Sequence, residues 1–360
     1  MRLSPTLSIY IARQLLIWLA VMAVGLSTLV FLLNFVEQLR RASGDAGLAM
    51  ELASLQLPFL VQKTLPFIIL FGSMMAFWRL SRSSELVVAR AAGISAWQFL
   101  LPAALLGTIV GVVQMTLFNP LASSMLARYE QVDAEHLRHS TSRLSVSPTG
   151  VWLRQGSDGG QTVINAQRIA RNGAELLTVI FFVFENPDKF VRRIDAGSAI
   201  LRDGYWLIRD ASLSTLDDPR RHVAEYRIDT DLTPDKIADS FASPETLSFW
   251  AIPGFLETLE AAGFSGHRHR LYWHSLLATP LLLGAMVLFA AVFTMKIGAR
   301  TSATRTIGAG VICSFMLYFL SDVIQAMGLS GSLPAILAAW SPAALASMLA
   351  MAMVFHLEDG

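Results

Sequence analysis

Cysteine and charged residues are scarce in this sequence. Among 360 residues there is one cysteine, Cys313, so the chain can form no internal disulfide and offers no cysteine-based zinc site. Charged residues make up 15% of the chain, against about 25% in an ordinary soluble domain. The formal net charge of +1 excludes the strongly basic surface of a nucleic-acid binder. Because 54% of the residues are hydrophobic, a disordered chain is excluded and a plain soluble enzyme is disfavoured.

The motifs of nucleotide-binding and hydrolytic sites are absent as well. There is no Gly-x-x-x-x-Gly-Lys-Ser/Thr segment, and only four lysines occur, so the chain cannot hold ATP phosphates in the Walker manner. No His-Glu-x-x-His, Gly-x-Ser-x-Gly or Ser-x-x-Lys segment is present. We therefore expect no catalytic residue, no metal site and no cofactor in this chain. If the chain takes part in active transport, a partner must supply the energy.

Long apolar runs are what the sequence has in abundance. A helix needs about 20 residues to cross about 30 Å of hydrocarbon, because each residue adds about 1.5 Å. Six runs qualify, three on each side of a polar middle: 15–35, 57–78, 99–118, 273–295, 307–327 and 333–355. They predict a first membrane region at 1–118, an inserted domain at 119–270 and a second membrane region at 271–360.

Basic residues in the short loops predict the orientation of these spans. If the N-terminus is cytoplasmic, the short cytoplasmic segments hold eight basic residues: Arg2, Arg13, Arg79, Arg82, Arg90, Lys296, Arg300 and Arg305. The short loops on the other side hold only Arg40 and Arg41. Both termini are then expected in the cytoplasm and the polar middle outside, since long translocated domains do not enter this count.

The polar middle has the pattern of an all-β domain. Apolar and alternating segments predict strands at 150–153, 161–166, 176–185, 196–202, 205–210 and 223–229. Asp203-Gly204, between two of these segments, is a strong signal for a two-residue hairpin. Strands at this spacing indicate a sandwich or a jelly roll. Helices are expected to flank it at 121–137 and 253–262.

The loop between the second and third runs predicts a short cytoplasmic helix at 83–92. Glu85 falls in its first turn, where a negative charge suits the helix dipole, and Gly93 can end it. Leu86 and Val87 give this helix an apolar edge. The pattern fits two interpretations, an interfacial connector with a capping acid or a docking helix for a cytoplasmic partner.

Three short motifs stand in a specific order along the chain. They are Phe-Val-Glu-Gln-Leu-Arg-Arg at 35–41, Ser-Glu-Leu-Val-Val at 84–88 followed by Ala92-Gly93, and Leu-Thr-Pro-Asp-Lys at 232–236. Together with the three-plus-three spans, they resemble the permease family LptF/LptG of lipopolysaccharide export, over nearly the whole chain. The third motif is closer to the LptG members than to LptF. The resemblance implies an α-helical membrane protein of six spans with an inserted periplasmic, jelly-roll-like β domain.

The resemblance also implies a function and a set of partners. A permease of this family, in the bacterial inner membrane, extracts lipopolysaccharide and passes it to a periplasmic protein bridge leading to the outer membrane. An LptG-like chain pairs with an LptF-type permease, an LptB-type ATPase docks below the pair as a dimer, and an LptC-type protein begins the bridge. ATP and magnesium would then be bound by the ATPase and not by this chain.

Residue roles follow from the same resemblance. Glu85 would contact the ATPase, within a coupling segment that also contains Leu86, Val87, Arg90 and Gly93. Arg40 and Arg41 would bind substrate phosphates. The family often has lysine where this chain has Asn34, and Lys63 is a candidate to supply the missing charge. Arg128 is a further phosphate candidate, and the first and fifth spans would form a lateral gate containing Leu26, Leu33, Phe319 and Asp322.

Without the resemblance, the residues can also be interpreted as having no specific functional role. Lys63 lies near the end of its run, so its side chain can reach the interface cheaply. Arg40, Arg41 and Arg128 can be solvated surface charges, and Asp322 can be solvated at the interface. A structural or sensory membrane protein with an external β domain would show the same six spans. A membrane-embedded hydrolase or acyltransferase would need convergent polar residues, which the runs hardly offer.

Overall fold

The computed structural model describes residues 5–83, 85, 88, 91, 95–136, 151–157, 160–170, 175–185, 189–202, 204–215, 221–230, 243–261, 266–295 and 303–358. The chain divides into two compact units. The helical unit comprises residues 1–130, 244–252 and 267–360, and the sheet unit comprises residues 131–243 and 253–266.

The helical unit confirms the six predicted spans. The described residues contain six helices that are long and apolar enough to cross a membrane. They are α1 (Pro5–Arg41), α2 (Ala46–Arg82), α4 (Ala96–Val113) with its continuation, α8 (His267–Met295), α9 (Ala303–Leu329) and α10 (Ala335–Glu358). The π-helical turn η1 (Gln114–Phe118) continues α4 directly into α5 (Asn119–His136). The predicted boundary at 118/119 therefore falls inside one continuous helix.

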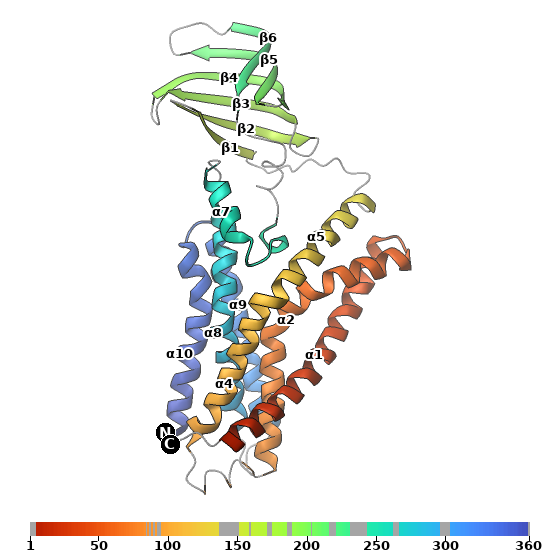
Figure 1. The fold of residues 1–360 in the computed structure, drawn as a ribbon, viewed down its shortest axis with the longest axis vertical. Coiled ribbons are helices and arrows are strands. Elements are labelled where there is room, and N and C mark those ends of the chain that lie inside the picture. Colours follow the sequence, from red (N-terminus) through yellow and green to blue (C-terminus); the bar gives the residue numbers. More distant parts are fainter. Residues whose placement is uncertain are drawn as a thin grey trace. The chain divides into compact units, whose positions relative to one another are not determined.

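A tight turn with a capping aspartate joins α1 to α2. Gly44 has a φ of +92°, a conformation that glycine adopts without steric cost. Asp45 follows as the N-cap of α2, where its Oδ1 accepts hydrogen bonds from the backbone N–H groups of Gly47 and Leu48 at 2.9 and 3.1 Å. The two helices consequently return alongside each other (Figure 1).

Glycines let α4 and α8 approach closely. A Cβ atom on Gly111 would lie 2.5 Å from Cα of Pro280, and one on Gly107 would lie 3.0 Å from the carbonyl oxygen of Leu283. Small residues four apart are a common way for membrane helices to bring their backbones together. This contact joins the first three spans to the last three.

Burial differs strongly among the spans and identifies the central helix. In the most apolar window of α8, 67% of the residues are buried, against 11% in α1 and 17% in α9. The core around α8 includes Leu283, Val287, Phe289 and Ala290. The helices α1 and α9 therefore form the outer surface of the helical unit, available to lipid or to a partner.

The sheet unit contains one six-stranded antiparallel sheet whose strands follow each other in sequence order. The strands are β1 (Val151–Ser157), β2 (Gly160–Ala170), β3 (Glu175–Glu185), β4 (Lys189–Arg202), β5 (Tyr205–Thr215) and β6 (Arg221–Asp229). The inserted β domain is thus confirmed. The described strands form a single sheet, in which each strand pairs with its neighbours in the sequence.

The hairpin between β4 and β5 and the core of the sheet agree with the sequence pattern. Arg202 pairs with Tyr205 across a two-residue connection, in which Gly204 has a φ of +82°. Alternating apolar side chains form one core, with Phe181 and Trp206 fully buried. Next to them the amide of the buried Gln155 accepts hydrogen bonds from Trp206 Nε1 and from the hydroxyl of Thr230. The flanking helix α7 (Ile252–Ala261) lies where the sequence predicted it.

Candidate functional site

The carboxylate of Glu85 is hydrogen-bonded to the first span. Its Oε2 accepts a hydrogen bond of 2.8 Å from the hydroxyl of Tyr10, and its Oε1 accepts one of 2.8 Å from Oγ of Ser83. Tyr10 lies on α1, so the acid predicted to contact an ATPase is joined to a helix predicted to form the gate. Four other residues of the predicted coupling segment lie outside the described residues: Leu86, Val87, Arg90 and Gly93. So does the motif at 232–236.

A polar junction connects α1, α2 and α5; we define it as Asn34, Gln38, Arg41, Gln56 and Tyr129. The buried Gln38 donates from Nε2 to Asn34 Oδ1 at 3.2 Å and to Gln56 Oε1 at 3.1 Å. Arg41 donates from Nη1 to the hydroxyl of Tyr129 at 2.8 Å and to Gln38 Oε1 at 3.1 Å. Hydrogen bonds between helices hold spans together where lipid provides no hydrophobic drive. Asn34 and Arg41 thus belong to a network that fixes helices.

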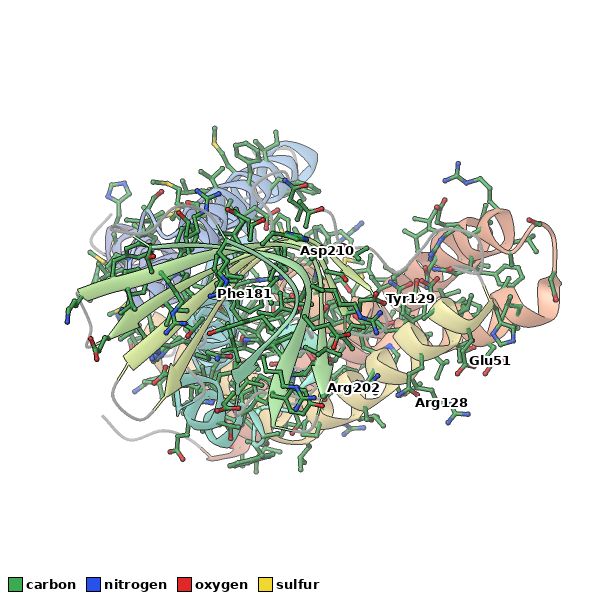
Figure 2. All side chains as sticks on the ribbon, turned by 90° about the horizontal axis from the view of Figure 1, so that it is seen from above. Glu51, Arg128, Tyr129, Phe181, Arg202 and Asp210 are labelled. Atoms are coloured by element: carbon green, nitrogen blue, oxygen red, sulfur yellow. The ribbon has the colours of Figure 1, made fainter. Side chains whose placement is uncertain are left out.

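Arg40 and Arg128 lie at the surface instead. The side chain of Arg40 is 78% exposed, and its Nη2 donates to both carboxylate oxygens of Glu37 at 2.8 and 2.9 Å. An exposed pair of this kind contributes little stability and exchanges readily. Arg128 is exposed on α5, and its side chain leaves the helix in a different direction from that of Tyr129 (Figure 2). Both guanidinium groups are therefore accessible to an anion.

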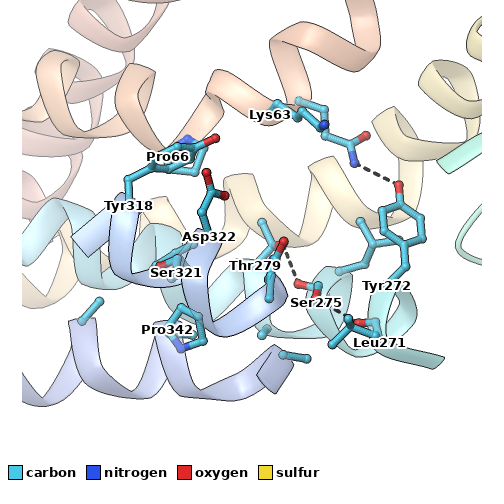
Figure 3. Close-up of a pocket in the computed structure, with 18 of the residues that line it drawn as sticks. Lys63, Pro66, Leu271, Tyr272, Ser275, Thr279, Tyr318, Ser321, Asp322 and Pro342 are labelled. Atoms are coloured by element: carbon cyan, nitrogen blue, oxygen red, sulfur yellow. Dashed lines mark hydrogen bonds between the residues drawn. The ribbon is translucent and has the colours of Figure 1, made fainter. Parts of the chain in front are cut away.

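A cavity of about 320 Å³ lies among α2, α8, α9 and α10 (Figure 3). Its walls are mainly apolar, but four charged side chains also line it: Lys63, Glu245, Arg268 and Asp322. Cavities of about 300–1,000 Å³ are typical of small-molecule sites. The structure therefore brings a predicted substrate-binding residue, Lys63, and a predicted gate residue, Asp322, into one cavity.

Lys63 and Asp322 enter this cavity from different helices. The ammonium of Lys63 lies 4.8 Å from the ring centroid of Phe59, one turn earlier on α2. Asp322 lies on α9, with its carboxylate pointing toward Pro66 of α2 (Figure 3). Both side chains are exposed. Within the described part of the chain, neither takes part in an ion pair, and Asp322 accepts no hydrogen bond.

One wall of the cavity is fixed by hydrogen bonds around the π-helical turn. The hydroxyl of Tyr272 accepts from Asn119 Nδ2 at 3.2 Å and from Gln62 Nε2 at 3.5 Å. Asn119, fully buried, accepts at its Oδ1 from the backbone N–H of Phe249 at 2.8 Å. π-Helical turns inside helices are frequent at functional sites. In the sequence, the only sign of this wall is the pair of amide side chains, Gln114 and Asn119, at the end of an apolar run.

Gln114, the first residue of the π-helical turn, has an unusual environment. Its side chain lines the cavity and is only 4% exposed. Its Oε1 has no hydrogen-bond partner among the described residues. A buried amide oxygen without a partner costs about 1–3 kcal/mol. Oε1 is itself buried, so it is not open to the cavity in this structure.

The predicted gate residues are not assembled into one contact. Leu33 on α1 and Phe319 on α9 are 65% and 70% exposed. Leu26 on α1 is half-buried. The helix α1 packs against α2 and α4, whereas α9 packs against α8 and α10. A gate between the first and fifth spans consequently stays a prediction. Among the described residues, no group of three or more histidine, cysteine, aspartate or glutamate side chains is arranged to hold a metal ion.

Comparisons with known proteins agree with this architecture. The sequence matches the family model described as lipopolysaccharide export system permease LptF/LptG over residues 9–355. It is 24% identical to the lipopolysaccharide export system permease protein LptG of Haemophilus influenzae, over 98% of both chains. It is 23% identical to the protein of the same name from Escherichia coli K12, over 93% of this chain and 94% of that one.

Proposed function

The chain belongs to the family of lipopolysaccharide export system permeases LptF/LptG, and from this premise we propose that it extracts lipopolysaccharide from the inner membrane for delivery to a periplasmic protein bridge. It acts as the LptG-like half of a heterodimer with an LptF-type permease. A separate LptB-type ATPase dimer, which holds ATP and magnesium, drives it from the cytoplasm. An LptC-type protein receives the lipid.

The observation that carries this proposal is the family match over nearly the full length of a six-span chain. The cavity with Lys63 supports it, because an amphipathic lipid needs apolar walls for its acyl chains and a cation for its phosphate. Arg40 and Arg128 supply further exposed cations for the same anionic headgroup. The chain itself is a multi-pass membrane protein, and we place both termini in the cytoplasm and the sheet unit in the periplasm.

Glu85 would transmit the movement of the ATPase to the membrane helices. We expect the ATPase to contact this carboxylate, so that closure of the ATPase dimer moves the segment between α2 and α4. Because Tyr10 donates to the same carboxylate, the movement would reach α1 as well as α2. The cavity would then narrow and the lipid would leave it.

The test is ATP-driven release of lipopolysaccharide from proteoliposomes that contain the complete transporter. Glu85→Lys replaces the contact with a repelling charge, and we expect release to fall about tenfold or more. Insertion of the chain into the membrane should be unchanged. The matched control is Glu51→Lys, an exposed acid on α2 distant in sequence from the coupling segment. Normal release and normal ATPase association in Glu85→Lys would refute the coupling role.

A further inference from the structure

The charges in the cavity are balanced, which is unexpected for a site that would bind only an anion. Lys63 and Arg268 contribute two positive charges, and Glu245 and Asp322 contribute two negative ones. A carboxylate in the same cavity repels a phosphate and opposes its attraction to lysine. A ligand whose only charged group is a phosphate would therefore bind more tightly if Asp322 were absent.

The four charged side chains of the cavity also do not pair with one another among the described residues. No ion pair within 4.0 Å joins any two of the four among the described residues. Ionisable side chains in membrane spans normally pair with one another or with a substrate or an ion. Lys63 on α2 and Asp322 on α9 thus offer one positive and one negative contact from two sides of one cavity.

Asp322 indicates what else the ligand carries. Its carboxylate accepts no hydrogen bond from the described residues, and a carboxylate takes a donor or a positive charge as its partner. The phosphate of a diester offers neither, whereas an ammonium group carries a positive charge and three N–H donors. Lys63 and Asp322 in one cavity therefore favour a ligand that contains both a phosphate and an amine.

We propose that the cavity binds a lipid headgroup that carries both a phosphate and a primary amine, with Lys63 on the phosphate and Asp322 on the ammonium. This inference rests on the proposed function and adds a specificity to it. The volume of about 320 Å³ suits a headgroup and the first part of its chains and not a whole lipid. The headgroup can come from an aminophospholipid of the bilayer or from a lipopolysaccharide whose phosphate bears an amine substituent.

The experiment compares two phospholipids on the purified full-length chain. Phosphatidylethanolamine and phosphatidylglycerol both carry a phosphate, but only the first carries an amine. Native mass spectrometry gives the affinity for each. We expect the wild-type chain to prefer phosphatidylethanolamine, and Asp322→Asn to weaken its binding about tenfold, which corresponds to about 1.4 kcal/mol. Binding of phosphatidylglycerol should be unchanged or stronger.

Three further variants serve as controls for this interpretation. Asp322→Glu keeps the carboxylate and should keep the preference. Lys63→Gln should weaken both lipids, because both present a phosphate. Glu51→Gln removes an exposed carboxylate elsewhere on α2 and should change neither. No preference for the amine in the wild type, or an unchanged preference in Asp322→Asn, would overturn the proposal.

A second arm identifies the source of the headgroup. Lipopolysaccharide with and without ethanolamine phosphate replaces the phospholipids in the same measurement. A dependence on Asp322 for the substituted lipopolysaccharide assigns the cavity to the cargo, whereas a dependence confined to phosphatidylethanolamine assigns it to a bilayer lipid. Release driven by ATP is measured separately. A wild-type chain that shows no preference for the amine but releases lipopolysaccharide refutes this inference alone, and a wild-type chain that shows the preference but no release refutes the transport function alone.

Discussion

At the residue scale, polar side chains of the helical unit fall into two groups. One group makes hydrogen bonds between helices, as Gln38 does between α1, α2 and α5 and as Tyr272 does beside the π-helical turn. The other group, with Lys63 and Asp322, lines the cavity without an ion pair among the described residues. We expect the first group to determine helix packing and the second to determine ligand binding.

Tyr10 provides a prediction at this scale. Tyr10→Phe removes the hydrogen bond to Glu85 and leaves the ring in place. A hydrogen bond to a charged group contributes about 1.5–3 kcal/mol and less when exposed, so we expect ATP-driven lipopolysaccharide release to fall about two- to tenfold. The ATP hydrolysis rate should fall less than release, because α1 no longer follows Glu85. Release and hydrolysis are measured on the same proteoliposomes.

The control for Tyr10→Phe is Tyr205→Phe in the sheet. The aromatic face of Tyr205 lies 5.0 Å from the guanidinium of Arg227, a contact that phenylalanine retains. This variant should release lipopolysaccharide as the wild type does. If Tyr10→Phe also behaves as the wild type, the hydrogen bond to α1 has no part in coupling.

At the scale of elements, the close contact between α4 and α8 is one of the contacts that join the two halves of the helical unit, beside that of α2 with α8. Gly111→Ala places a methyl group 2.5 Å from Cα of Pro280, which is too close, so the backbone of one helix must shift. Such overpacking costs about 1–3 kcal/mol. We expect a lower melting temperature of the purified chain, measured from intrinsic tryptophan fluorescence.

Gly25→Ala is the matched substitution for this prediction. Gly25 lies on α1, and a Cβ atom there would meet no other atom within 4 Å. Because alanine is also the better helix former, this variant should be at least as stable as the wild type. A Gly111→Ala chain that melts with Gly25→Ala would mean that α4 and α8 are not held by this close approach.

Which elements the sequence could predict depended on how local their signal is. Apolar runs predicted the six spans, and alternation predicted six strands, because burial of one face repeats along the element itself. The first half of β4 was missed because Arg192, Arg193 and Asp195 interrupt its apolar pattern. The π-helical turn was missed as well, since Gln114 sits in a run that is otherwise apolar.

The candidate site could be predicted only in part for the same reason. Glu85 and the arginines after the first span belong to short contiguous motifs that the sequence displays directly. The cavity is different, because its lining comes from residues between 59 and 346. No local pattern shows that Lys63 and Asp322 line one cavity, or that Tyr10 contacts Glu85. Those pairs are created by helix packing.

At the scale of the whole molecule, the orientation can be measured directly. In a chain with Cys313→Ala, single cysteines are placed at Val88, between α2 and α4, and at Arg209 on β5, both of which are exposed. A membrane-impermeant maleimide should label the cysteine at 209 in intact spheroplasts. It should label the cysteine at 88 only after the membrane is opened. Equal labelling of both in intact spheroplasts would contradict export to the periplasm.

The helices of the two halves differ in length, and this gives the protein walls of unequal height. The helices α1 and α2 have 37 residues each, or about 55 Å, whereas α9 and α10 have 27 and 24, or about 40 and 36 Å. The second pair is nearer to a hydrocarbon layer of about 30 Å. The helices α1 and α2 therefore either tilt or project beyond the hydrocarbon layer, together with the polar junction near their joined ends.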